Sequence, residues 1–301
     1  MSRVHCGDMG AARYGRTMAL TGTRVIVALL RSTHPGPSVV VTAIAIALGI
    51  AAGLDPLRIG VLGLAILLGQ FSVGLSNDAI DARRDRVAGR RDKPIAAGAA
   101  SVRSAWVSAF ATLGAALALS AVLSWWMLAA HALALLSAWS YNAWLKSTPA
   151  SVVPFIVSFG LLPSLVTLAA ADPRPAAAWA WIAGAAIGVA VHLTNVLPDL
   201  EDDARTGVRG LPHRLGRRVS ASIAAVALVG GAVAVLVGPI AESGAPTMLG
   251  WAAFGAVLAI AAGGLVLALV RPPGRWVFRL VMLAALMLCV QLAATGQSLA
   301  G

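Results

Sequence analysis

The chain has 301 residues, of which 59% are hydrophobic and only 12% are charged. Because soluble domains usually carry about 25% charged residues, this composition indicates an integral membrane protein. The net charge of +11 does not indicate a nucleic-acid partner, since the basic residues lie in short segments between long apolar runs, as membrane topology signals do. Cys6 and Cys289 lie at opposite ends of the chain, which excludes a disulfide framework and a cysteine-rich metal site.

The first 31 residues form a separate N-terminal segment. Arg24 and Arg31 bracket a run of only six apolar residues, Val25–Leu30, which is shorter than the apolar region of a cleaved signal peptide. We therefore expect residues 1–31 to be a cytoplasmic segment with an interfacial helix. Residues 32–301 are expected to form one membrane domain.

Eight stretches of the chain contain no Asp, Glu, Lys or Arg and match a bilayer core, which needs roughly 20 apolar residues in a helix. The third has 42 residues, enough for two spans that turn near Leu123–Trp126. The sequence therefore predicts an all-α fold with nine transmembrane helices in one bundle. The eight stretches are Ser32–Leu54, Ile59–Asn77, Ser104–Leu145, Ser147–Ala171, Pro175–Pro198, Val219–Ala241, Ser243–Val270 and Leu280–Gly301.

The basic residues test this helix count independently. If the N-terminus is cytoplasmic, 21 of the 23 basic residues fall in cytoplasmic segments, as the positive-inside rule predicts, and only Arg58 and Arg174 fall outside. Eight or ten helices would scramble this distribution. The charges therefore predict nine spans, with the N-terminus in the cytoplasm and the C-terminus outside.

Eight of the twelve acidic residues lie in two clusters, each at the predicted cytoplasmic end of a span. Carboxylates at a membrane edge are costly and so indicate a functional site. At 100° per residue, each cluster places four polar residues within one 100° arc of a helix. The first arc holds Asn77, Asp78, Asp81 and Asp85, and the second holds Asn195, Asp199, Asp202 and Asp203, whereas Glu201 points away.

The two clusters belong to similar units, each made of a span, an acidic helix end, a basic loop and a new span. On one membrane side and four spans apart, such units can face each other across a bundle. Clustered carboxylates need cations, and an all-oxygen ligand set favours Mg²⁺ or Mn²⁺ shared with phosphate oxygens. This predicts a phosphorylated, lipid-like substrate. The basic residues available to a diphosphate are Arg84, Arg90, Arg91, Lys93, Lys146, Arg205 and Arg209.

The motifs resemble those of the UbiA superfamily of intramembrane prenyltransferases. The first cluster, Asn77-Asp78-Ala-Ile-Asp81-Ala-Arg-Arg-Asp85, resembles the family's NDxxDxxxD motif, and Asp199-Leu-Glu-Asp202-Asp203 resembles its second Asp-rich motif. Each is followed by a Pro-x-x-x-Gly loop. Tyr141 and Lys146 resemble the family's Tyr-x-x-x-Lys element with one extra residue between them, and Lys93 stands where many members carry arginine. The resemblance covers Ser32 to the C-terminus.

The resemblance implies a bundle with a central cavity, in which an isoprenoid chain passes from its diphosphate to an acceptor through an allylic cation. The acceptor is expected to be aromatic, as in quinone or related lipid biosynthesis, and the active site to face the cytoplasm of a bacterial cell. Two Mg²⁺ ions (Mn²⁺ as an alternative) would be held, partly through water or diphosphate, by Asp78, Asp81, Asp85, Asp199 and Asp203, and Asp202 would join these in catalysis. Tyr141 would offer a π face to the cation, Asn77 and Asn195 would orient ligands, and His192 is expected to be a packing residue.

Other functions stay open at this point. A terpene cyclase of the same superfamily would use the same acids without an external acceptor. A divalent-cation carrier is disfavoured because the middles of the spans carry no charge. A phosphotransferase for nucleotide-linked alcohols is disfavoured because its contiguous DG-x-x-AR motif is missing.

Overall fold

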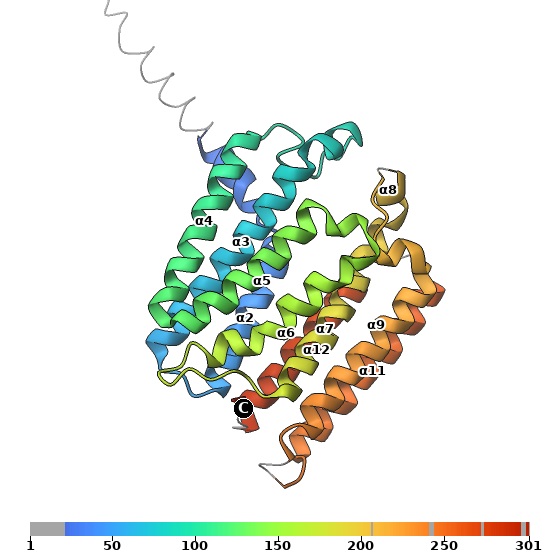
Figure 1. The fold of residues 1–301 in the computed structure, drawn as a ribbon. Coiled ribbons are helices and arrows are strands. Elements are labelled where there is room, and N and C mark those ends of the chain that lie inside the picture. The colour runs from blue at the N-terminus through green and yellow to red at the C-terminus, as the bar shows by residue number, and fades with distance from the viewer. Residues whose placement is uncertain (1–21, 206, 241–243, 272–273, 296–298, 301) are drawn as a thin grey trace, which may run out of the picture.

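The computed structural model describes residues 22–205, 207–240, 244–271, 274–295 and 299–300, without the side chains of residues 202 and 293–295. Residues 1–21, which make up most of the predicted N-terminal segment, lie outside these ranges. The regular elements within them are helices (Figure 1), apart from one isolated bridge between Ala176 and Ala300. The all-α prediction is confirmed.

The helices follow one another with short connections. A helix at Gly22–Ser32 comes first. The long helices after it are α2 (Pro35–Ala51), α3 (Pro56–Val87), α4 (Val102–Leu123), α5 (Trp125–Ala143), α6 (Val153–Thr167), α7 (Ala178–Val196), α9 (Leu211–Val237), α11 (Met248–Val270) and α12 (Arg275–Thr295). The short ones are the 3-10 helices η1 (Leu145–Ser147), η2 (Pro149–Val152) and η3 (Leu197–Asp199), and α8 (Leu200–Arg205).

Polar caps set the helix starts. The side chains of Asp55, Ser101, Ser124 and Thr247 each accept a hydrogen bond from a backbone N–H in the first turn of the following helix. Ser124 stands between α4 and α5 and also donates to the Leu168 carbonyl at 2.7 Å. The predicted turn within the 42-residue apolar stretch therefore lies at a single capping serine.

Seven described helices are long and apolar enough to cross a membrane, and an eighth span results if Gly22–Ser32 and α2, which meet at 59°, are counted as one. This supports a multi-pass membrane protein. The predicted number of nine goes beyond these seven or eight. α5 does not pass the same test, because polar residues such as His131 and Asn142 interrupt its apolar sequence.

Six helices form a ring around the centre of the bundle. α2, α3, α5, α6, α7 and α12 contact one another in that order, and α12 closes the ring by contacting α2. α4 packs outside α3 and α5, whereas α9 and α11 pack on the side of α7 and α12 (Figure 1). The acidic helix ends and α8 lie at the same end of this ring.

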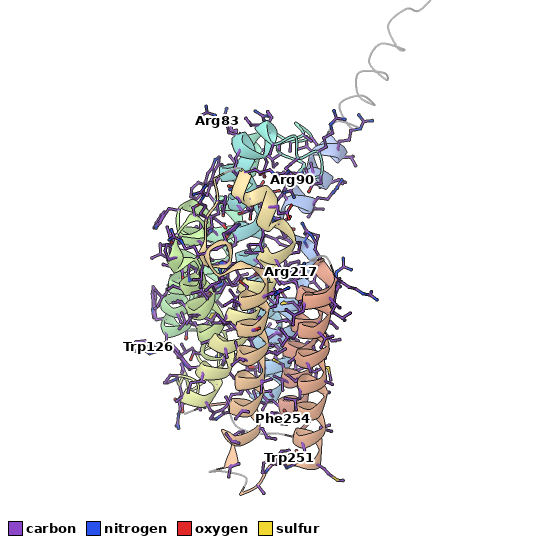
Figure 2. The ribbon with its side chains drawn as sticks, turned by 90° about the vertical axis from the view of Figure 1, so that its right-hand side faces the viewer. Arg83, Arg90, Trp126, Arg217, Trp251 and Phe254 are labelled. Atoms are coloured by element: carbon purple, nitrogen blue, oxygen red, sulfur yellow. The ribbon has the colours of Figure 1, made fainter. Side chains whose placement is uncertain are left out.

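The two ends of the bundle differ in composition. Figure 2 shows Arg83 and Arg90 near one end, and Trp251 and Phe254 near the other. At this second end, Arg58 donates from Nη1 to the Ala169 carbonyl at 2.7 Å and so ties the start of α3 to the end of α6. The basic and acidic residues of the motifs thus gather at the end opposite to Arg58.

Candidate active site

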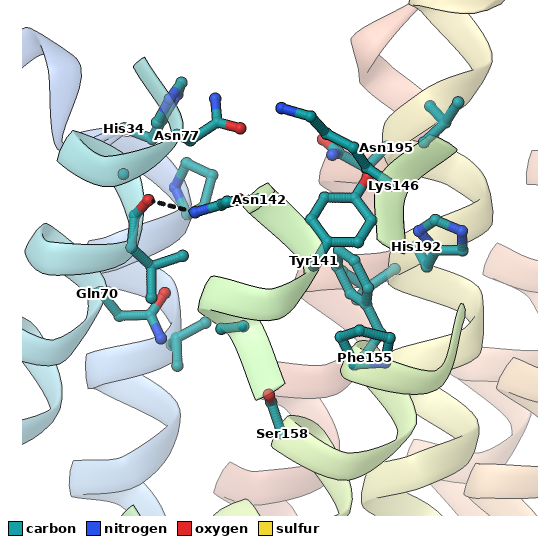
Figure 3. A pocket seen from close by; sticks show the side chains of 18 of the residues that line it. His34, Gln70, Asn77, Tyr141, Asn142, Lys146, Phe155, Ser158, His192 and Asn195 are labelled. Carbon is teal, nitrogen blue, oxygen red and sulfur yellow. Dashed lines mark hydrogen bonds between the residues drawn. The ribbon is translucent and has the colours of Figure 1, made fainter. Parts of the chain in front are cut away.

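A cavity of about 350 Å³ occupies the centre of the ring (Figure 3). Residues from all six ring helices line it, as do two residues from the start of α9, and no described residue of α4 or α11 does. Its volume lies within the range of pockets that bind small organic ligands. The sequence therefore folds into a bundle with the central cavity that the family resemblance implies.

One face of α3 supplies the first acidic group. Asn77, Asp81 and Asp85 follow one another at four-residue spacing, lie on one side of the helix and line the cavity. Asp81 is 6% exposed and Asp85 is 5% exposed. Carboxylates this buried require cationic or hydrogen-bonding partners.

Two cations bind these carboxylates. Arg84 donates from Nη2 to Asp81 Oδ2 at 2.9 Å and lies 3.6 Å from Asp85 Oδ1. The Lys146 ammonium contacts Asp81 Oδ1. Lys146 reaches it because the chain leaves α5 and continues in the 3-10 helix η1, so the extra residue after Tyr141 does not prevent the contact. Burial lowers the pKa of Lys146, and Asp81 opposes this by favouring the charged form.

The second acidic group follows α7. Asp199 ends η3, Asp203 lies in α8, and both line the cavity. The pKa of Asp203 is raised to about 6, first by burial and then by the negative charges of Asp199 and Asp81, with Arg84 opposing. Because Asp81 belongs to α3, the two acidic groups lie within electrostatic reach of each other across the cavity.

Two residues near this second group were not predicted. Arg275, at the start of α12, places Nη2 3.8 Å from Asp199 Oδ2, and His213, at the start of α9, places Nε2 3.8 Å from Asp203 Oδ2. Both line the cavity. In the sequence Arg275 is one of many arginines in basic loops and His213 is isolated, so only the fold identifies them.

Most of the predicted site residues line the cavity. These are Asn77, Asp81, Arg84, Asp85, Arg90, Lys93, Tyr141, Lys146, Asn195, Asp199 and Asp203. The described residues of the predicted set that do not line it are Asp78, Arg91, Arg205 and Arg209. The side chain of Asp202 lies outside the described residues. Arg91 and Arg209 are exposed, and Arg205 lies 3.8 Å from Glu201, which is 90% exposed.

Asp78 has partners of its own. It is 2% exposed, and its Oδ1 accepts hydrogen bonds from Lys93 Nζ at 2.7 Å and His34 Nε2 at 3.2 Å. Its Oδ2 has no hydrogen-bond partner among the described residues. Asp78 therefore links α3 to the start of α2 and to the basic loop, and its role as a metal ligand stays a prediction.

His34 reaches Asp78 from a bend in the chain. It has a φ of 52° and precedes Pro35 between the Gly22–Ser32 helix and α2. The bend packs on α3 at Gly74, where a Cβ would lie 2.8 Å from the Thr33 carbonyl oxygen. Only glycine permits this approach, which places His34 one helical turn from Gly74 along α3, beside Asp78.

Aromatic rings form the wall below Lys146 (Figure 3). Tyr141 packs edge-on against Phe155 and His192, with ring centroids 5.1 Å and 5.8 Å away. His192 is fully buried, and its Nε2 lies 3.1 Å from the Ser151 hydroxyl. The Nδ1 atom of His192 has no described partner. His192 and Tyr141 both line the cavity, and the packing role expected for His192 stays a prediction.

The donor chemistry of the site fits a hard divalent cation. No three His, Cys, Asp or Glu side chains among the described residues lie close enough to hold a metal by themselves. Mg²⁺, however, is commonly bound through one or two carboxylates plus substrate phosphate oxygens. Burial, and after it the neighbouring charges of Asp199 and Asp81, raise the pKa of Asp203, so a bound cation would favour its ionised form. The residues present therefore fit a metal that a phosphorylated substrate helps to hold.

The profile of the UbiA prenyltransferase family matches residues 38–286. The chain belongs to this family. A relative among characterised proteins is the digeranylgeranylglyceryl phosphate synthase of Methanopyrus kandleri, which is 32% identical over 161 residues. The match covers 53% of this chain and 58% of that protein, so it spans less than two thirds of the relative.

Solved structures confirm the UbiA fold. A UbiA homolog from Archaeoglobus fulgidus bound to GPP and Mg²⁺ superposes with a TM-score of 0.70 at 15% identity, covering 89% of this chain and 98% of the other. The apo structure of a UbiA homolog from Aeropyrum pernix K1 gives 0.70 at 16% identity, covering 86% and 98%. At this identity the likeness concerns the fold alone.

Proposed function

We propose that this UbiA family member transfers an isoprenoid chain from a prenyl diphosphate to an acceptor inside the central cavity. The observation that carries the proposal is the juxtaposition of Asp81 and Asp85 on α3 with Asp199 and Asp203 after α7, at one end of the central cavity. The structural neighbour bound to GPP and Mg²⁺ supports it.

The carboxylates would hold the metal. Asp81, Asp85, Asp199 and Asp203 are the candidates that line the cavity, Asp78 completes the predicted ligands of the two ions, and Asp202 would join these residues in catalysis. When bound, Mg²⁺ or Mn²⁺ neutralises the negative charge that develops on the leaving diphosphate. Arg84 and Lys146 meanwhile keep the carboxylate of Asp81 in position.

Basic residues at the cavity would bind the diphosphate. Arg84, Lys93 and Lys146 line it next to the carboxylates, and each carries donors for phosphate oxygens. Arg90 also lines the cavity, but Asp92 accepts two hydrogen bonds from its guanidinium, at 3.0 Å and 2.9 Å. Arg84 and Lys146 are also paired, but with Asp81, a candidate metal ligand that lines the cavity, so we place these two nearest the leaving group.

The reaction breaks the allylic C–O bond, and its electron pair leaves with the diphosphate. The acceptor atom forms the new bond to carbon and loses its proton. The Tyr141 ring lines the cavity and would face the cationic carbon, and the neighbouring rings of Phe155 and Phe159 would exclude water from that carbon. Asn77 and Asn195 would orient the two substrates.

Two acceptor classes are to be tested. The motif resemblance implies an aromatic acceptor, and the name of the Methanopyrus kandleri relative indicates a glycerophosphate-type acceptor. A terpene cyclase would instead release a cyclised hydrocarbon without any acceptor. A divalent-cation carrier would move metal into sealed vesicles and leave prenyl diphosphates intact.

The topology is part of the proposal. Nine spans, with the N-terminus in the cytoplasm and the C-terminus outside, place the acidic helix ends on the cytoplasmic side. Both substrates would then approach from the inner leaflet or the cytoplasm. The basic residues around Arg83 and Arg90 lie at this same end of the bundle (Figure 2), which supports this orientation.

The deciding experiment uses purified protein with Mg²⁺, radiolabelled prenyl diphosphates and a panel of aromatic and glycerophosphate acceptors. Asp81→Asn and Asp203→Asn should each lower turnover by at least about 100-fold, the scale on which mutations of electrostatic catalytic groups act. Asp172→Asn, at an exposed acid near the other end, is the matched control and should stay active. Full activity of either site variant, in protein that still folds, would overturn the proposal.

A further inference from the structure

Two polar side chains lie deep in the cavity, far from the proposed reaction centre. Gln70 on α3 and His131 on α5 both line it. Gln70 precedes Asp85 on one continuous helix by 15 residues, which corresponds to about 22 Å. These two side chains therefore lie well below the carboxylates along the cavity wall, with Ile66 lining the cavity one helical turn further on.

His131 is fixed in place by its neighbours. Its Nδ1 lies 2.7 Å from the Ser120 hydroxyl on α4, and that hydroxyl also donates to the Ala116 carbonyl at 2.8 Å. The ring packs against α3 at Gly69, where a Cβ would lie 2.8 Å from Nε2. The imidazole is thus wedged between α4 and α3, with a small exposed part at the cavity.

The second ring nitrogen of His131 and the amide of Gln70 have no hydrogen-bond partner among the described residues. Polar groups inside proteins are nearly always hydrogen-bonded, to protein or to ordered water. Apolar side chains such as Val41, Leu162 and Leu165 also line the cavity and cannot supply a hydrogen bond. Solvent in the cavity is therefore the available partner for both side chains.

We propose that Gln70 and His131 set the upper length of the isoprenoid chain that the cavity accepts. This inference rests on the proposed function, because it requires a prenyl diphosphate with its phosphates at Asp81 and its tail pointing down the cavity. A hydrocarbon tail that reaches this depth displaces the solvent and offers no hydrogen bond in return. Each polar group left unpaired costs about 5- to 150-fold in affinity.

The proposed limit predicts that the enzyme prefers shorter tails among prenyl diphosphates that share the same reactive end. A tail that ends above Gln70 leaves the solvent at both polar groups undisturbed. A longer tail reaches both polar groups and displaces that solvent, and apolar lining residues such as Val41, Leu162 and Leu165 offer it no hydrogen bond in return. The two side chains act on substrate choice, and Gln70 lies roughly 16 Å along α3 from Asp81, where the phosphates would bind.

The test compares kcat/KM for geranyl, farnesyl, geranylgeranyl and longer polyprenyl diphosphates in the wild type, Gln70→Leu, His131→Leu and the double variant. Each substitution should raise the ratio of long to short substrate by about 5- to 150-fold. The value for the shortest accepted substrate should change little. A wild-type length profile in active variants overturns the length limit.

Controls separate this result from other failures. Thr112→Val also removes a polar group, but from α4 and away from the cavity, and should keep the wild-type profile. His131→Leu leaves the Ser120 hydroxyl its hydrogen bond to the Ala116 carbonyl. If the His131→Leu variant nevertheless fails to fold, Gln70→Leu alone tests the length limit, because Gln70 loses no protein partner. If the wild type consumes none of the diphosphates, the proposed function itself is wrong. Consumption with an unchanged length profile removes only the length limit.

Discussion

Asp203 shows how burial and neighbouring charges in the site change the pKa of a carboxyl group. Its side chain is 24% exposed, and His213 is 3.8 Å away. Burial, Asp199 and Asp81 raise its pKa from 3.8 to about 6. The folded protein therefore holds a proton on Asp203 at pH values where the unfolded chain has lost it.

This shift predicts a pH dependence of stability. In metal-free protein the free energy of unfolding should fall as the pH rises from about 3.8 through about 6, because the folded state binds more protons than the unfolded state in this window. Added Mg²⁺ needs ionised carboxylates, so its stabilising effect should grow over the same window. Thermal unfolding with EDTA or Mg²⁺ measures both trends.

Asp203→Asn is the control for this pH series. Its stability should depend less on pH between 3.8 and 6 than that of the wild type, and Mg²⁺ should stabilise it less at neutral pH. Identical pH profiles for the two proteins would show that Asp203 does not titrate as stated.

Asp78 shows how far single residues follow from the sequence. The helical arc correctly brings Asp81 and Asp85 to one cavity, because four-residue spacing fixes a face. Asp78 lies at the edge of that arc, and its surroundings depend on His34, 44 residues earlier, and Lys93 in the next loop. Periodicity within one helix contains no information about such partners.

Among the elements, α6 and α7 pack with their backbones close together. A Cβ at Gly188 would lie 2.4 Å from the Phe155 carbonyl oxygen, and one at Gly184 would lie 2.3 Å from that of Phe159. Small residues let helices in a membrane approach this closely. The contact fixes Phe155 and His192 in the aromatic wall of the site.

Gly188→Ala should therefore destabilise the protein by about 1–3 kcal/mol, the usual cost of overpacking, because the two backbones must move apart. Gly230→Ala on α9 is the matched control, since a Cβ there has no atom within 4 Å. Thermal unfolding in detergent should show a lower midpoint for the first variant only. Equal midpoints would contradict the close packing.

Element boundaries were predictable where local chemistry sets them. The turn at Ser124 and the helical continuation of α3 to Val87 follow from apolar length and from the spacing of the acids. The bend at His34 was missed, although Pro35 directly after it disfavours a helical conformation at that residue. The 3-10 turn that carries Lys146 to Asp81 depends on tertiary contacts and has no clear signal in the sequence.

At the scale of the molecule, the cavity explains why α5 falls short of a hydropathy criterion for membrane spans. α5 contributes His131, Tyr141, Asn142 and other polar groups to the interior, so its mean hydropathy falls although it runs beside apolar neighbours. Polar residues that face a cavity are tolerated in a bundle because they avoid lipid. The distribution of charge between the two ends of the bundle does not depend on the hydropathy of α5. It is therefore a stronger topology signal than helix hydropathy.

That signal predicts which end of the bundle faces the cytoplasm. In protein whose native cysteines are replaced (Cys6→Ser, Cys289→Ala), a single cysteine is introduced at exposed Arg83, near the acidic end, or at Met248, which is 92% exposed near the other end. A membrane-impermeant maleimide should label Met248→Cys in right-side-out vesicles and Arg83→Cys in inverted vesicles. The reverse pattern would place the carboxylates outside, where a cytoplasmic prenyl diphosphate cannot reach them. Labelling of both cysteines from one side would require an even number of spans between them, whereas the predicted topology has an odd number.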